Sequence, residues 1–385
     1  MPGDPPVSSR PKRPSLAAIR QRRLAVALIA ALALALMAVT ITTAVHALFG
    51  GTTPDATATT PSPSPTPTPL TPEEALLKTA ADPTKACAVS FRGDGIALAP
   101  MLQTAGVLFT GLPIPERAGS VFAGWYPTPE TAQTQTQTDR VNGSQLTTCV
   151  GHRRTLYAAW VTPEQNTAAG SKIPILMYHW FTSKPGGEDN WLRGNYIYIE
   201  DFRAQMAYIA TSKFYLPTWD ELNAFIDGKL YLPPHSVIIT DDDNEPTWFQ
   251  LAVPVVTEDK LLATSFVITS TRQEGSPSAY VLQRSHTDDM HRAGDNGKGR
   301  MVNLSADEVA ADVEKSAQIL GAKEVVAYPF GHYNVTAEEG VTKAGFPLAR
   351  TTEYGMVKIG TPKLELPVVR VNYGDTADDL KRAIG

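Results

Sequence analysis

Short apolar runs alternate with longer amphipathic stretches along the C-terminal half of the chain. Phe202, Met206 and Ile209 recur at helical spacing, and capping boxes beginning at Thr218 and Ser305 mark the starts of two further helices. Short buried strands that alternate with amphipathic helices predict an α/β domain on a parallel sheet, either open or closed into a barrel. The predicted strands span residues 173–178, 236–240, 264–268, 324–328 and 366–371.

A different pattern precedes this region. Residues 73–161 contain strand-like stretches at 88–91, 120–125 and 155–161, separated by Gly, Pro and polar residues. They predict a small β-rich domain, which follows a short helix that begins after Thr71. A polar break at 162–171 separates it from the α/β domain, predicted over residues 172–385.

The N-terminal part has no such alternation. Residues 24–49 form an apolar run without a charge, long enough at about 1.5 Å per residue to cross a bilayer of about 30 Å. With a basic cytoplasmic tail at 1–23, the run predicts a single-pass membrane anchor that leaves the following domains extracytoplasmic. The alternative is a signal peptide cleaved near Ala47, and hence a secreted protein. Residues 50–72, rich in Pro, Thr and Ser, are predicted to be a linker.

Charge changes the picture of possible partners. Residues 1–23 carry six basic residues and one acid, a charge of +5, so the total of -5 leaves -10 on the remainder. An acidic body excludes a general nucleic-acid binder, because neutralising phosphates requires a clustered basic surface.

The chain has two cysteines, Cys87 and Cys149, both in the small β-rich region. Outside the cytoplasm, such a pair predicts a disulfide. Two unrelated buried thiols are the alternative.

Three polar clusters directly follow predicted strands, where a parallel α/β fold gathers its functional groups. They are residues 241–244 (DDDN), the pair His286 and His291, and residues 328–334 (YPFGHYN). Imidazole and carboxylate ligands suit Zn²⁺ or a similar cation. Taken singly, the acidic run also fits a solvated turn, and the third cluster also fits a Pro/Gly turn.

In this order, the clusters resemble the motifs of the polysaccharide deacetylase family, the NodB-homology domain, over about residues 173–376. The resemblance implies a distorted (β/α) barrel that removes N-acetyl, sometimes O-acetyl, groups from glycans with a divalent metal, usually zinc. It implies Asp242 as general base and Asp243, His286 and His291 as metal ligands. The backbone N–H of Tyr328 is implied to hold the oxyanion, and the groove wall is implied to include Pro329, Phe330, Leu366 and Arg370.

The chain departs from the family pattern at several positions. Asp241 replaces a hydrophobic residue, which leaves open a register with Asp241 as base and Asp242 as ligand. Asn244 replaces a glycine, and Asn tolerates the left-handed conformation that a glycine would supply. Ala327 stands where many members have the Arg that orients the base. Residues 364–370 lack the usual acid histidine, so His179 or His332 is expected to supply the proton for the leaving amine.

The small β-rich region resembles an internalin B-repeat β-grasp module, through AVSFRGDG, VFAGWYPTPE and TLYAAWV. That resemblance implies a spacer or adhesive unit, in which Trp125, Tyr126, Tyr157 and Trp160 serve core and cross-strand packing.

The sequence therefore predicts a membrane-anchored, extracytoplasmic deacetylase that uses a divalent metal and acts on an N-acetylated glycan, either peptidoglycan or an exopolysaccharide. The alternative from another class is a catalytically inactive relative that binds cell-wall glycan or mediates adhesion. A glycosidase is disfavoured, because it would need a paired acid and base without the histidines.

Overall fold

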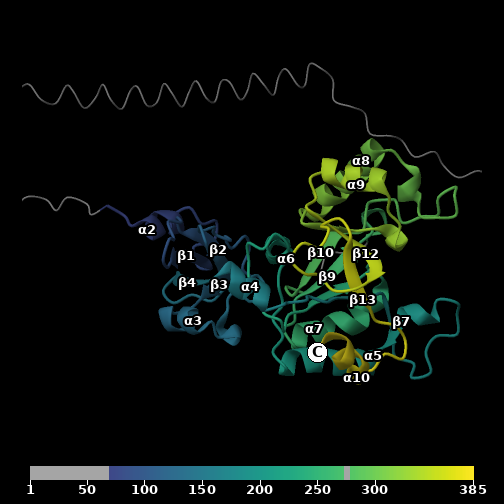
Figure 1. Ribbon diagram of the computed structural model, residues 1–385, viewed down its shortest axis with the longest axis horizontal. Helices are drawn as coiled ribbons and strands as arrows, with labels where there is room; N and C mark the ends of the chain where they lie inside the picture. The colour runs from purple at the N-terminus through teal and green to yellow at the C-terminus, as the bar shows by residue number, and fades with distance from the viewer. Residues whose placement is uncertain (1–68, 273–277) are drawn as a thin grey trace, which may run out of the picture. The chain divides into compact units, whose positions relative to one another are not determined.

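The structure is a computed structural model that describes residues 69–272 and 278–385. A four-stranded sheet comes first along the chain, and a closed barrel follows (Figure 1). Within these residues, no helix is both long enough and apolar enough to cross a membrane. That finding overturns the predicted localisation as a single-pass membrane protein, and the predicted membrane partner is not supported. Residues 24–49, on which both predictions depended, lie outside the described residues, as do the tail at 1–23 and most of the predicted linker.

The first sheet has the strand order β2-β1-β4-β3. Its central pair, β1 and β4, is parallel, and the two outer pairs are antiparallel. Its strands are β1 (Ala86–Arg92), β2 (Met101–Thr104), β3 (Val121–Tyr126) and β4 (Arg153–Val161), accompanied by helices α2 (Pro72–Leu77), α3 (Pro129–Thr134) and α4 (Pro163–Ala168) and by the 3₁₀ turn η1 (Gln137–Asp139).

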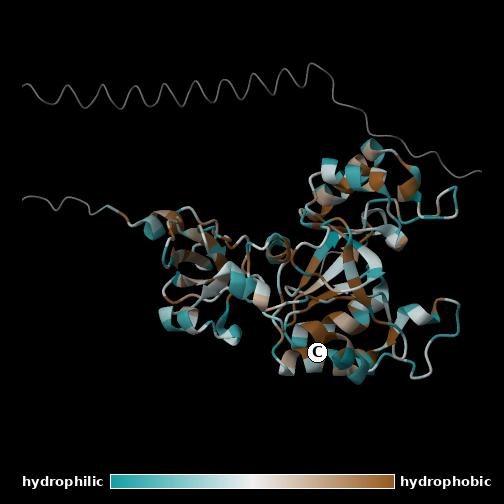
Figure 2. Ribbon diagram, in the orientation of Figure 1, coloured by the Kyte–Doolittle hydropathy of each residue, from teal (hydrophilic) through white to brown (hydrophobic). Residues whose placement is uncertain are grey.

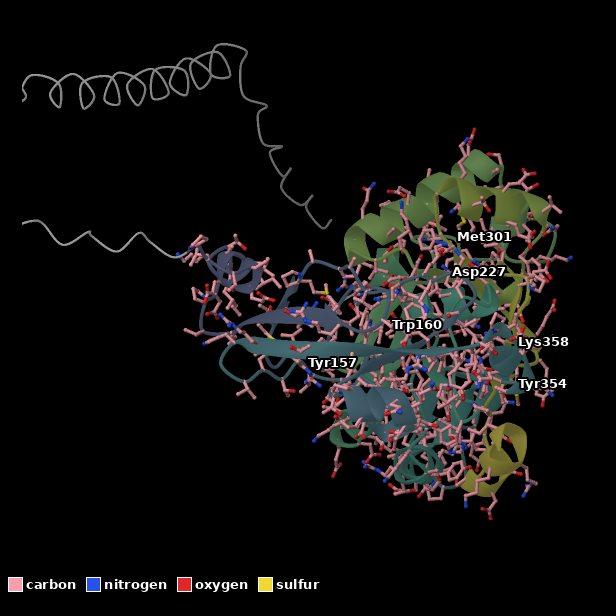
Figure 3. All side chains as sticks on the ribbon, turned by 60° about the vertical axis from the view of Figure 1, so that its left-hand side comes forward. Tyr157, Trp160, Asp227, Met301, Tyr354 and Lys358 are labelled. Atoms are coloured by element: carbon pink, nitrogen blue, oxygen red, sulfur yellow. A yellow bond between two sulfur atoms is a disulfide. The ribbon has the colours of Figure 1, made fainter. Side chains whose placement is uncertain are left out.

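Aromatic packing and one disulfide hold this sheet together. The Trp125 ring lies 4.7 Å from Phe91 and 5.1 Å from Phe122, centroid to centroid, and its indole N–H donates to Pro113 O at 2.8 Å. Tyr157 and Trp160 lie along β4 (Figure 3). Cys87 on β1 is joined to Cys149 by the predicted disulfide, with a Cα–Cα distance of 6.1 Å.

The barrel consists of parallel strands in the order β10-β11-β12-β13-β5-β8-β9. It agrees with the predicted α/β class and with the closed form of the sheet. Its strands are β5 (Ile175–Tyr178), β8 (Ile238–Asp241), β9 (Ala263–Val267), β10 (Val281–Ser285), β11 (Val325–Ala327), β12 (Leu348–Tyr354) and β13 (Leu366–Arg370). Strands β5, β8 and β9 are buried along their whole length, and β5 is accordingly apolar throughout. In Figure 2, brown hydrophobic segments lie on strands and helices of the barrel, and teal hydrophilic segments are frequent on its outer loops.

Helices surround the barrel. Helix α5 packs against α7 and α10, and α8 packs against α9 and β10. The predicted capping boxes are present at the starts of α6 and α8. The helices are α5 (Ile199–Thr211), α6 (Trp219–Ile226), α7 (Val253–Glu258), α8 (Ala306–Leu320), α9 (Val335–Lys343) and α10 (Ala377–Ile384). The shorter elements are a π-helix, η3 (Trp248–Ala252), the 3₁₀ turns η2 (Arg193–Asn195), η4 (Thr269–Thr271), η5 (Arg300–Asn303) and η6 (Pro329–Gly331), and a two-stranded ribbon of β6 (Trp180–Thr182) and β7 (Tyr196–Tyr198).

A buried polar network joins the first sheet to the barrel. Arg140, 1% exposed, donates to Tyr231 O at 2.8 Å and pairs with Glu221 of α6 at 3.5 Å. The Glu221 carboxylate also accepts from Asn142 Nδ2, at 2.6 Å, and from the Tyr215 hydroxyl. We call Arg140, Asn142, Tyr215 and Glu221 the joint.

Candidate functional site

The three polar clusters converge at the carboxyl ends of barrel strands. β8 ends at Asp241, so Asp242 and Asp243 stand just beyond it, while His286 directly follows β10. His179 directly follows β5, which pairs with β8. Because neighbouring parallel strands all end at one rim, residues far apart in sequence meet there.

Asp243, His286 and His291 each bring one ligand atom into a group whose members lie within 4.8 Å of one another. Asp243 Oδ1 lies 3.4 Å from His286 Nε2 and 3.2 Å from His291 Nε2. These are the residues that the sequence predicted as metal ligands.

The His286 ring is held in a defined orientation. Its Nδ1 lies 2.9 Å from Ala327 O, and a carbonyl can only accept, so Nδ1 carries the proton. Nε2 is therefore the ring nitrogen that faces Asp243. A ligand histidine whose second nitrogen donates to a carbonyl is the arrangement found at protein metal sites.

The side chains fit a divalent cation. Asp243 Oδ1 is a buried carboxylate oxygen with no hydrogen-bond partner among the described residues. One carboxylate oxygen and two imidazole nitrogens suit Zn²⁺ or a similar borderline ion. Burial, followed by the nearby His286, lowers the pKa of His291 to about 4, so its imidazole is neutral and able to ligate at neutral pH.

Asp242 is held by an arginine that sequence analysis missed. Arg350, in the interior of β12, is completely buried, and its Nη2 donates to both oxygens of Asp242. Its guanidinium also lies 4.9 Å from the Phe266 ring centroid. Burial alone would raise the pKa of Asp242, but Arg350 and then His179 outweigh it, so the pKa lies below its usual value.

Asp241 is set apart from this group. It is completely buried, and one oxygen accepts from Ser265 Oγ at 3.2 Å, while the other has no partner among the described residues. Burial, reinforced by Asp242 and Asp243, raises the pKa of Asp241 well above its usual value. Ser265 Oγ also contacts Asn244 Oδ1 at 3.1 Å.

The two candidate acid histidines differ in their surroundings. His179 Nε2 lies 3.8 Å from Asp242 Oδ2, and burial lowers the pKa of the ring below its usual value. His332 accepts the Gly299 N–H at its Nδ1, 2.8 Å away, and does not belong to the ligand group. The structure thus brings His179, but not His332, against Asp242.

Four residues of the site loops have left-handed backbone conformations. They are Asp243 (φ 74°), Asn244 (φ 54°), Thr287 (φ 69°) and Phe330 (φ 58°), half of the non-glycine residues with positive φ in the described part of the chain. For a β-branched residue such as Thr287 this conformation is costly. Such strain gathers where a side chain must be aimed for function.

The expected role of Tyr328 needs correction. Its backbone N–H, expected to hold an oxyanion, donates to Arg350 O at 3.0 Å, continuing the ladder between β11 and β12. Its ring is buried and stacks on Tyr333. Sequence alone could not show that this N–H is already used by the sheet.

The residues expected to form the groove wall lie in different environments. Leu366 is completely buried in the hydrophobic core, so it cannot form a groove wall. Pro329 is buried, whereas Phe330 is 46% exposed and its ring lies 4.2 Å from that of His291. Arg370, at the end of β13, donates to Asn195 Oδ1 at 2.7 Å and lines a separate small cavity of about 140 Å³.

A carboxylate on α8 supports the histidine loop. Asp312 accepts the backbone N–H groups of Asp288 and Asp289, at 2.6 and 2.9 Å. Both donors lie between the two histidines of the ligand group. Asp312 therefore fixes the backbone that carries them.

A cavity of about 610 Å³ adjoins the ligand group, and Asp243 and His291 belong to its wall. Trp180, Glu245 and Phe249 line its other sides. Its size falls within the range of ligand-binding clefts.

The site combines side chains suited to bind a metal ion with a carboxylate fixed by an arginine, at the rim of a parallel barrel. This combination is typical of hydrolases. The chain is similar to the poly-β-1,6-N-acetyl-D-glucosamine N-deacetylase of Staphylococcus aureus strain MRSA252, with 24% identity over 161 residues that cover 36% of this chain and 56% of that protein. It thus spans little more than half the length of this curated relative. No family model matches the chain.

Among solved structures, the chain is similar to the Streptococcus pyogenes deacetylase PplD in complex with acetate, at 22% identity and a TM-score of 0.47, covering 56% of this chain and 98% of that one. It is also similar to IcaB from Ammonifex degensii, at 21% identity and a TM-score of 0.47, covering 56% and 97%. The sequence similarity supports the predicted resemblance to polysaccharide deacetylases. The resemblance to an internalin B-repeat module is not confirmed.

Proposed function

We propose that this protein is a polysaccharide deacetylase that uses a divalent cation to hydrolyse the acetamido groups of an N-acetylglucosamine polymer. The observation that carries the proposal is the convergence of Asp243, His286 and His291 beside a carboxylate, Asp242, that a buried arginine holds in place. The sequence similarity to an N-deacetylase of such a polymer gives independent support.

Asp243, His286 and His291 would hold the cation. When bound, a divalent cation supplies Lewis acidity, which polarises a carbonyl and lowers the pKa of water. Zn²⁺ is the proposed ion, because the donors are one carboxylate and two imidazoles. The base and ligand pair is then Asp242 and Asp243. The ligand group contains Asp243 and not Asp242, which argues against the alternative register, in which Asp242 would be the ligand.

Asp242 takes the proton of the water that attacks the acetamide carbon. Arg350 orients its carboxylate and balances its charge, because both oxygens accept from one guanidinium nitrogen. Many deacetylases have an orienting Arg where this chain has Ala327. Arg350, which pairs with Ala327 on the neighbouring strand β11, would serve that function here. It is a positioning residue, since it acts through Asp242.

The leaving nitrogen requires a proton before the C–N bond breaks. His179 is the proposed donor, because its Nε2 lies 3.8 Å from Asp242 Oδ2 and a small movement would allow a hydrogen bond. His179 would pass on the proton that Asp242 takes from the water.

The backbone N–H of Tyr328 already donates within the sheet, so the N–H of Phe330 is the proposed oxyanion donor, since it has no acceptor among the described residues.

We also propose that residues 73–161 and 172–385 are distinct domains and that the first resembles a β-grasp module. The strand order β2-β1-β4-β3 with a parallel central pair supports this proposal. The first domain would act as a spacer held rigidly by the joint.

Acetate release from a β-1,6-linked N-acetylglucosamine oligomer tests the proposed activity. The zinc-loaded protein should release acetate, and Asp242→Asn should reduce kcat by about 10³-fold or more, as expected when a general base is lost. His286→Ala should lose both acetate release and zinc, measured by elemental analysis. Glu339→Gln, at an exposed carboxylate, is the control. Equal release by all variants would overturn the mechanism. Protein that takes up no zinc and releases no acetate would instead indicate a glycan-binding relative.

A further inference from the structure

The cavity beside the ligand group is lined by residues from several segments. Asp243 and His291 of the ligand group belong to its wall, while Glu245, Phe249 and Gln250 come from the segment that leads into and through η3. Trp180 of β6 contributes a second aromatic ring. An acetamide bound at the ligand group would therefore leave the neighbouring sugar unit of its chain in this cavity.

The walls suit a pyranose ring. The indole of Trp180 is held by an edge contact with Tyr196, at 5.1 Å between ring centroids. Phe249 offers a second partly buried ring. Aromatic faces bind the C–H faces of sugar rings through apolar contact, and polar side chains at the rim accept from hydroxyl or amino groups.

The charges of the cavity all have one sign. Among the described residues that line it, Asp243 and Glu245 are the two carboxylates, and none is a lysine or arginine. A cation at the ligand group would offset Asp243. Glu245 would then be the remaining uncompensated charge of the wall.

Glu245 is anchored through one oxygen only. Its Oε2 accepts from the Thr247 N–H at 2.8 Å and from the Thr247 hydroxyl. Its Oε1 has no hydrogen-bond or ion-pair partner in residues 69–272 and 278–385. A carboxylate that is fixed by one oxygen and free at the other is prepared to accept from a cationic donor.

We propose that this cavity is a subsite for a sugar unit that carries a free ammonium group, recognised by Glu245, next to the unit being deacetylated. The inference rests on the proposed function, because the reaction itself makes this group. Water adds to the acetamide carbon, the C–N bond breaks, and the products are acetate and an ammonium on the sugar. The new ammonium is repelled by the cation that formed it and attracted by Glu245. The glycan therefore advances by one sugar unit after each turnover. As a result, partly deacetylated glycan is a better substrate than fully acetylated glycan.

Two synthetic pentamers of β-1,6-linked N-acetylglucosamine test this subsite, one fully acetylated and one with a free amine on its central unit. We expect kcat/KM per acetyl group of the zinc-loaded wild type to be about tenfold higher on the amine-bearing pentamer. Glu245→Gln removes the charge but keeps an acceptor for Thr247, so it should lower the ratio of kcat/KM for the two pentamers to about one. Glu339→Gln, with the same charge change at an exposed position, should keep the preference.

Salt provides a measurement that needs no variant. Raising the ionic strength should abolish the preference of the wild type and leave its rate on the acetylated pentamer nearly constant, because only the first depends on a partly exposed charge pair. A wild type without preference, or a preference that Glu245→Gln retains, would overturn the subsite. If neither pentamer loses acetate with any protein, the proposed function itself fails, and that result is distinct from a failure of the subsite alone.

Discussion

Two completely buried arginines, each paired with a carboxylate, serve two different regions of this molecule. Arg140 of the joint pairs with Glu221, and Arg350 of the barrel pairs with Asp242. Both arginine side chains have no exposed surface. The residue types and the burial are the same, so the difference between the regions lies in what surrounds each carboxylate.

The carboxylate of the joint is saturated with donors. Glu221 Oε1 accepts from Tyr215 and Arg140, and Oε2 accepts from Asn142 and from the Thr218 N–H at the start of α6. Such a network specifies how two parts of the chain pack together.

The carboxylates of the site are left open instead. Asp241 Oδ1, Asp243 Oδ1 and His179 Nδ1 are buried and have no hydrogen-bond partner within the described ranges. The loops around them also hold left-handed residues such as Thr287. Unsatisfied atoms and strained backbone cost stability, and they persist where binding needs free ligands. Buried charge alone therefore does not mark a functional site, whereas buried charge beside free lone pairs does.

The largest expected difference comes from removing each arginine. Arg140→Met and Arg350→Met should both lower the free energy of unfolding by about 3–5 kcal/mol, since each leaves a buried carboxylate unpaired. Only Arg350→Met should reduce kcat for acetate release, by about 100-fold or more. Arg350→Lys should restore little, because an ammonium does not reproduce the guanidinium geometry. Urea titration and acetate release measure the two quantities. An Arg350→Met protein that is folded and fully active would break the comparison.

The second-largest expected difference between the two regions is the response of stability to zinc. Zn²⁺ at about 100 times its Kd should stabilise the wild type by about 2.7 kcal/mol, because it binds the folded state alone. Asp243→Asn should lose this gain, and its metal-free form should be less stable than the wild type, because the nearby histidines, His286 first, outweigh burial and hold the pKa of Asp243 below its usual value. Glu221→Gln should be less stable yet keep the full response to zinc. Thermal unfolding with zinc and with a chelator measures both effects, and a zinc response in Asp243→Asn would contradict the assignment of the ligands.

A smaller effect should come from the support of the histidine loop. Asp312→Ala frees the backbone N–H groups of Asp288 and Asp289, and it should weaken zinc affinity by about 10–100-fold. Glu314→Ala on the same helix removes a carboxylate that pairs with Lys323, and it should leave zinc affinity within about twofold. Competition with a chromophoric chelator measures the affinity. Equal losses in both variants would indicate a general effect on α8.

The smallest effect should come from Asn244, which stands where the deacetylase motif has a glycine. Asn244→Gly should change the free energy of unfolding by no more than about 1 kcal/mol and keep activity, because glycine adopts the left-handed conformation without strain. Asn244→Val should lower both, since a β-branched residue is disfavoured at a φ of 54°. Activity in Asn244→Val equal to that of the wild type would show that the turn does not position Asp243.

The sequence predicted that the three residues of the ligand group lie close together, and the structure agrees. It did not predict two of the strands that carry or precede residues of the site. β10 and β12 were not predicted, because Gln283, Arg284 and Arg350 interrupt their apolar pattern. From the sequence alone, an arginine such as Arg350 is expected at the surface. In the barrel its side chain is buried and contacts Asp242. The same limit explains the corrections at Tyr328 and Leu366, since sheet pairing and burial depend on neighbours that are distant in sequence.

The sequence by itself determined the local features: the capped starts of α6 and α8, the short strands β5, β8 and β9, the cysteine pair, and the residue types of the ligand group. These features follow from periodicity and side-chain chemistry within a few neighbouring residues. Only the tertiary structure decided that Asp242 is held by Arg350, that His179 rather than His332 lies beside it, and that Glu245 keeps a free oxygen in the cavity. Each of these is a contact between segments far apart in the chain, and closure of the barrel sets which strand ends become neighbours.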